Sequence, residues 1–131
     1  MKIRSALYKL FLPSGLKHSV VKKHETAKFT VKYKDLIVGY LELQNREWLF
    51  LYSDEFKHQD HIAPLPDYPD VNKVYENDEL WPFFLIRIPS LKQPKVQNII
   101  SKENIDPSSQ VELLKRFGAK SISNPFELTY V

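Results

Sequence analysis

The short motif His58-x-Asp60-His61 contains the residue types best suited to metal chemistry in this sequence. Imidazole and carboxylate groups are ordinary ligands of Zn²⁺ and related ions, but a working site needs further ligands on a rigid backbone. This motif instead precedes a proline-rich segment, and histidine pairs in loops are usually solvated. We therefore expect no metal site. The alternative, an enzyme that uses these three residues, predicts bound metal on elemental analysis.

Other catalytic arrangements are poorly supported. A group of carboxylates could pair for acid–base chemistry, but a solvated acidic patch that ends in a helix cap is the better explanation. The chain has only three glycines and no cysteine, so it can build neither a glycine-rich phosphate loop nor a thiol nucleophile. We expect no catalytic residue and no cofactor. The carboxylates in question are Asp67, Asp70, Glu76, Asp78 and Glu79.

The composition is that of a globular protein. The chain has 131 residues, of which 43% are hydrophobic and 13% aromatic, and this length predicts one domain. No apolar run approaches the roughly 20 residues that a membrane span needs. The basic start resembles a signal peptide, but Lys9 interrupts its apolar stretch. Together with the absence of cysteine, this favours a cytoplasmic protein without membrane contact.

Positive charge is concentrated at the N-terminus. Residues 1–34 contain nine lysines and arginines against Glu25 alone, a formal charge of +8, so the remainder of this +3 chain carries −5. We interpret residues 1–25 as a basic N-terminal extension. A solvated lysine-rich end explains the charge, and direct contact with nucleic acid is the alternative. That alternative makes the protein a nucleic-acid-binding accessory protein.

The middle of the chain predicts three antiparallel strands. Phe29, Val31 and Tyr33 alternate with polar residues, which is typical of a half-buried strand. A turn at Lys34-Asp35 leads to a second strand, and a turn at Gln44-Asn45-Arg46 leads to a third. Short turns between successive strands indicate a meander.

Three short helices and a final strand are expected after the proline-rich segment. The first begins with a cap at Asn77 or Asp78 and ends before Pro89, and the second begins near Pro94. The third has Asp106 as N-cap, Pro107 at its first position and Gly118 as its stop. The predicted fold class is therefore α+β: a small antiparallel sheet, closed by a C-terminal strand, with about three short helices packed on it.

The first of these helices contains more large apolar side chains than one core stripe requires. At helical spacing Trp81, Phe84, Leu85 and Ile88 share one face. Leu80 and Phe83 are then surplus, and Arg87 lies on their side. Tryptophan and arginine are enriched at binding hot spots, although a helix buried on all sides would explain the same pattern.

A resemblance to a known family supports the binding interpretation. "LWPFFLIRIPS" and "PKVQNIISKENIDPSSQVELLKRFGAKSISNPFEL" resemble the N-terminal subdomain of the HipA-type serine/threonine kinase toxins. In that subdomain a small sheet is followed by an aromatic helix that ends in proline, an isoleucine-rich helix, a helix that ends in glycine, and a closing strand. We therefore interpret residues 26–131 as a HipA N-terminal-subdomain-like domain.

The resemblance implies a function. A free-standing copy of this subdomain is similar to the HipS component of three-gene HipBST toxin–antitoxin systems, in which the kinase lacks the subdomain. It implies an antitoxin that neutralises a HipT-like kinase toxin by occluding its active site or locking it inactive, in a ternary complex with a HipB-like DNA-binding protein. The expected partner-binding residues are Leu80, Trp81, Phe83 and Arg87, with Asp78 and Glu79 facing basic groups of the kinase.

Overall fold

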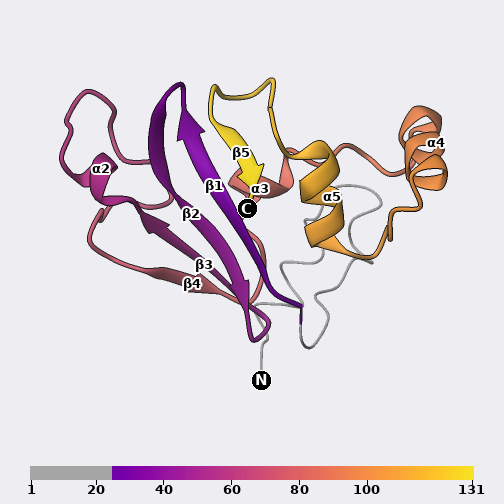
Figure 1. Cartoon of the computed structure of the whole chain (residues 1–131), viewed down its shortest axis with the longest axis horizontal. Helices are drawn as coiled ribbons and strands as arrows, with labels where there is room; N and C mark the ends of the chain where they lie inside the picture. The colour runs from indigo at the N-terminus through magenta and orange to yellow at the C-terminus, as the bar shows by residue number, and fades with distance from the viewer. Residues whose placement is uncertain (1–24) are drawn as a thin grey trace.

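A five-stranded antiparallel sheet forms the body of residues 25–131, the part of the chain that this computed structural model describes (Figure 1). The strand order is β4-β3-β2-β1-β5. This confirms the α+β class, the central meander and the closing C-terminal strand. The predicted N-terminal extension lies outside the described residues, except for Glu25. The strands are β1 (Ala27–Tyr33), β2 (Leu36–Gln44), β3 (Glu47–Tyr52), β4 (Tyr75–Asn77) and β5 (Glu127–Tyr130).

Both predicted turns of the meander are present, and each is two residues long. Tyr33 pairs with Leu36 across one turn, and Gln44 pairs with Glu47 across the other. In the second turn Asn45 and Arg46 both have positive φ angles, of 50° and 64°. A two-residue turn in which both residues have the left-handed backbone conformation has a twist that suits the right-handed twist of the flanking strands.

Alternation along the strands produces the core. Phe29 of β1 pairs with Leu41 of β2, which pairs with Phe50 of β3, so these three side chains point to the same face of the sheet. All three are buried, as are Trp48 and Tyr52 on β3. The lysines of β1 alternate with the buried residues, as the sequence predicts.

A short helix and an ordered loop follow β3, and the sequence pattern did not predict the helix. Ser53 caps α2 (Asp54–Lys57) by accepting a hydrogen bond from the Phe56 amide. The buried hydroxyl of Tyr52 donates to the carbonyl oxygen of Tyr68 at 2.6 Å and accepts from the amide of Leu65 at 2.9 Å. The proline-rich segment is therefore fastened to the sheet.

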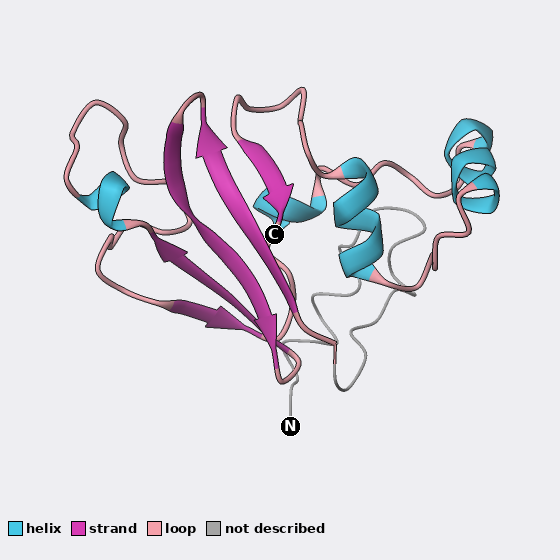
Figure 2. Ribbon diagram, in the orientation of Figure 1, coloured by secondary structure: helices cyan, strands magenta, loops and turns pink. Residues whose placement is uncertain are grey.

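The remaining helices are α3 (Pro82–Leu85), α4 (Pro94–Lys102) and α5 (Gln110–Phe117). Figure 2 shows α5 beside the sheet and α4 farther out, at the end of the molecule remote from α2. Val111, Leu113 and Leu114 of α5 are buried, so this helix packs its apolar side on the core. Within residues 25–131 no helix is long and apolar enough to cross a membrane.

Two predicted helix starts are wrong. Asn77 does not cap α3, because its backbone pairs with Trp48 as part of β4, and α3 begins only at Pro82 with Trp81 as its N-cap. Asp106 does not cap α5. Its carboxylate accepts from the amide and hydroxyl of Ser108, which closes a turn, and Ser109 is the N-cap.

Candidate partner-binding surface

The inner side of α3 is part of the core. Phe84 has no exposed surface, and Leu85 and Ile88 each have 3%. These are three of the four residues of the predicted core stripe, and the fourth, Trp81, is half-buried. This packing fixes which side of the helix faces outward.

Trp81 lies half-buried at the start of this helix. Its ring meets that of Tyr68 edge-on, with centroids 5.2 Å apart, and Tyr68 stacks on Phe50 at 4.2 Å. The indole therefore ends a series of aromatic contacts that begins in the sheet. Part of Trp81 stays accessible, so its predicted contact with a partner remains a prediction.

The interpretation of Leu80 as surplus to the core is wrong. Its side chain has no exposed surface. Leu80 precedes α3, and Trp81 after it is in the extended region. A helical wheel therefore does not apply to Leu80, which points into the core instead.

The predicted outward position of Arg87 is also wrong. Only 5% of this residue is exposed. It donates hydrogen bonds to the carbonyl oxygens of Gly118 at 3.0 Å and Phe126 at 2.6 Å, and to Asn124 Oδ1 at 2.9 Å. Burial lowers the pKa of Arg87 below its ordinary value. Arg87 thus joins the end of α3 to the segment between α5 and β5.

Asp78 and Glu79 lie half-buried in the bend between β4 and α3. The side-chain amide of Asn77 donates to the carbonyl oxygen of Glu79 at 2.8 Å, which shapes this bend. The predicted contact of the two carboxylates with basic groups of a kinase remains a prediction.

The outward side of α3 carries apolar side chains. Ile86 is 51% exposed, Pro82 is exposed and Phe83 is half-buried. The ring of Phe83 contacts that of Phe126 with centroids 5.9 Å apart, and Phe126 contacts Tyr33 at 5.6 Å. We call these five residues the α3 strip: Tyr33, Pro82, Phe83, Ile86 and Phe126.

Comparison with known proteins identifies the family of the chain. A family profile described as the HipA N-terminal domain matches residues 29–122. The chain belongs to the HipA N-terminal domain family. A search of curated proteins found no match. The match includes β2, β3, β4 and all of the described helices, and it ends before β5.

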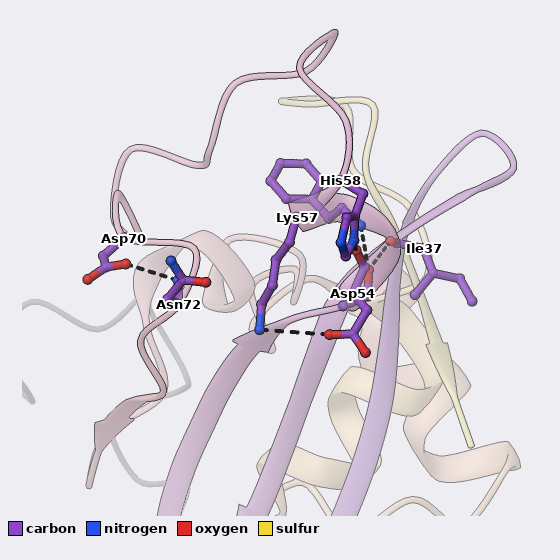
Figure 3. A network of polar contacts seen from close by, with 8 residues as sticks. Ile37, Asp54, Lys57, His58, Asp70 and Asn72 are labelled. Atoms are coloured by element: carbon purple, nitrogen blue, oxygen red, sulfur yellow. Dashed lines mark hydrogen bonds and ion pairs between the residues drawn. The ribbon is translucent and has the colours of Figure 1, made fainter.

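The histidine motif lies elsewhere in this HipA N-terminal domain, next to α2. Figure 3 shows Lys57 and His58 both turned toward Asp54. His58 Nδ1 donates to the carbonyl oxygen of Asp54 at 2.6 Å, and Lys57 Nζ lies 3.9 Å from its carboxylate. Asp60 and His61 are exposed. Among residues 25–131 no group of three histidine, cysteine, aspartate or glutamate residues is placed to hold a metal ion.

Proposed function

We propose that this chain is an antitoxin of the HipS type. It binds and neutralises a HipT-like serine/threonine kinase toxin through protein–protein contact, in the cytoplasm and in a ternary complex with a HipB-like DNA-binding protein. The observation that carries the proposal is the family match over residues 29–122. In this proposal the chain has no catalytic role and needs no cofactor.

The exposed residues of α3 support a binding role. Helix α3 presents an exposed proline, and its C-cap Ile86 is half-exposed beside aromatic rings, so together they offer an apolar surface. Contiguous apolar surface on a small domain usually marks a site of contact with another protein. Aromatic side chains are also enriched at the centres of such contacts.

Neutralisation requires only differential binding. If the domain binds one conformation of the kinase more tightly than the others, the population shifts toward that conformation. A domain that covers the nucleotide or substrate site, or that holds the kinase lobes in an unproductive arrangement, therefore suppresses phosphoryl transfer without any chemistry of its own.

The test is co-production with the kinase. Cells that produce a HipT-like kinase encoded beside this chain are expected to stop growing and to recover when this chain is induced. The kinase is expected to co-purify with it. The matched control is the kinase alone with an empty vector. Unchanged growth arrest and no co-purification from cells that contain folded antitoxin contradict the proposal.

The competing function, a nucleic-acid-binding accessory protein, is favoured by the formal charge of +8 on residues 1–34. It predicts that the purified full-length chain retards duplex DNA, with an affinity that falls steeply as salt rises. The antitoxin proposal predicts weak retardation that is lost near physiological salt. DNA binding that weakens as salt rises but persists at physiological salt, in the absence of kinase binding, would favour the competing function.

A further inference from the structure

Arg87 is a buried cation that has no counter-ion among the residues that the structure describes. Only 5% of it is exposed, and its three hydrogen-bond acceptors are two carbonyl oxygens and one amide oxygen, none of which carries a formal charge. No carboxylate of residues 25–131 forms an ion pair with it, and its Nε atom is buried without a hydrogen-bond partner. A buried charge is usually paired with an opposite one, because removal from water is costly.

This charge lies directly beneath the α3 strip. The guanidinium carbon of Arg87 is 5.7 Å from the centroid of the Phe83 ring, and Arg87 also bonds the carbonyl oxygen of Phe126. Both aromatic residues belong to the strip. The Nζ atom of Lys34 lies 5.5 Å from the centroid of the Tyr33 ring, so a second positive charge borders the strip.

We propose that the α3 strip docks on an apolar surface of the kinase that carries a carboxylate, and that the buried charge of Arg87 selects this carboxylate. This inference rests on the proposed antitoxin function. Docking replaces water over the strip with protein, which lowers the local dielectric and strengthens the attraction between the buried guanidinium and an acidic side chain placed at the edge of the contact. The carboxylate need not touch Arg87, since the attraction acts through the thin aromatic layer.

The proposal makes a charge-sign prediction at Ile86, which is exposed in the strip. Ile86→Asp and Ile86→Lys both remove the apolar contact, but only the aspartate repels the carboxylate of the partner. Val74 is the matched control. It is 50% exposed, against 51% for Ile86, and it precedes β4 at the opposite edge of the sheet from β5.

The experiment is calorimetric titration of the purified HipT-like kinase encoded beside this chain with full-length variants of the chain. Both Ile86 variants are expected to bind less tightly than the wild type. The dissociation constant of Ile86→Asp should exceed that of Ile86→Lys by about fivefold or more. This difference should shrink when the salt concentration is raised. Val74→Asp and Val74→Lys are expected to bind as the wild type does. Thermal unfolding of each variant confirms that it is folded.

The outcomes separate the two proposals. The docking inference is overturned if the wild type binds the kinase and both Ile86 variants bind it as tightly as the wild type does. It is also overturned if the two variants are weakened by the same factor. In both cases the antitoxin function stands. If Ile86→Lys is the weaker binder, the partner surface is basic and the inference is again overturned. If the wild type does not bind the kinase at all, both proposals fail.

Discussion

Arg87 Nη1 donates a hydrogen bond of 3.0 Å to the carbonyl oxygen of Gly118, 31 residues farther along the chain. Gly118 is also the C-cap of α5, and its amide donates a hydrogen bond to the carbonyl oxygen of Leu114. A Cβ atom at residue 118 would lie 2.6 Å from the carbonyl oxygen of Leu114, so only glycine fits. The pair therefore locks the end of α3 to the end of α5 and fixes the position of the α3 strip.

This pair predicts that Arg87→Met destabilises the domain. The substitution removes the guanidinium donor from two carbonyl oxygens and from Asn124 Oδ1, which keeps only the Phe126 amide. We expect a loss of about 1–3 kcal/mol in the free energy of unfolding. Removal of a buried charge offsets part of this loss, which sets the upper limit. Urea denaturation followed by circular dichroism measures the change.

The control for this prediction is Arg116→Met. Arg116 pairs with Glu103 at 2.7 Å, but the two side chains are 42% and 45% exposed. Exposed ion pairs contribute little, so we expect this variant to unfold close to the wild type. If Arg87→Met also unfolds like the wild type, Arg87 does not hold the α5–β5 segment in place.

The two tryptophans provide a second prediction. Trp48 has no exposed surface, whereas Trp81 is half-buried and ends the aromatic series through Tyr68. Trp48→Ala should cost about 3–5 kcal/mol of stability, and Trp81→Ala about 1–2 kcal/mol. Trp81→Ala should also weaken kinase binding beyond its effect on folding. Melting temperature and affinity are measured on the same preparations, and equal stability losses for the two variants would show that Trp81 belongs wholly to the core.

The strand pattern was predictable because its signals are local. The period-2 alternation around Phe29 and the short turn at Asn45-Arg46 each depend on neighbouring residues. The helix starts were less predictable. The capping propensity of Asn77 was overridden by its pairing with Trp48 in the sheet, which is a contact across 29 positions that no local window contains.

The candidate site was predicted only in part, for a related reason. The exposed Ile86 and the half-buried Phe83 follow once the core side of α3 is known, but Leu80 and Arg87 were placed by a helical wheel that extends beyond the actual helix. Tyr33 and Phe126 join the strip through tertiary packing. A lone arginine in an apolar run was the one available signal, since a charge there must find buried partners.

Tyr52 predicts how stability depends on pH. Burial, opposed by the hydrogen bond from Leu65 and aided by Tyr75, raises the pKa of Tyr52 from 10.0 to about 12. The folded state therefore retains the phenolic proton over a range in which the unfolded state loses it. Stability from this group is complete below pH 10 and falls as pH rises from 10 to about 12, by about 1.4 kcal/mol per pH unit. Denaturation across this range should be less steep in pH for Tyr52→Phe, and identical slopes would contradict the assignment.

The turn between β2 and β3 provides a stabilising variant. Arg46 has a φ angle of 64°, a conformation that costs a residue with a Cβ atom roughly 1 kcal/mol. Arg46→Gly creates the Asn-Gly sequence that this turn type prefers, and we expect the melting temperature to rise. Lys28→Gly, at an exposed position inside β1, should lower it. A lower melting temperature for Arg46→Gly would show that its side chain contributes more than the turn strain costs.

The central proposal is that this HipA N-terminal domain binds and silences a HipT-like kinase. Its most direct test is a phosphorylation assay of the HipT-like kinase encoded beside it, titrated with the purified full-length protein. The account predicts that kinase activity falls to background at equimolar protein, and that Ile86→Asp requires a large excess to do the same. Full kinase activity at a saturating excess of the folded wild-type protein would contradict it.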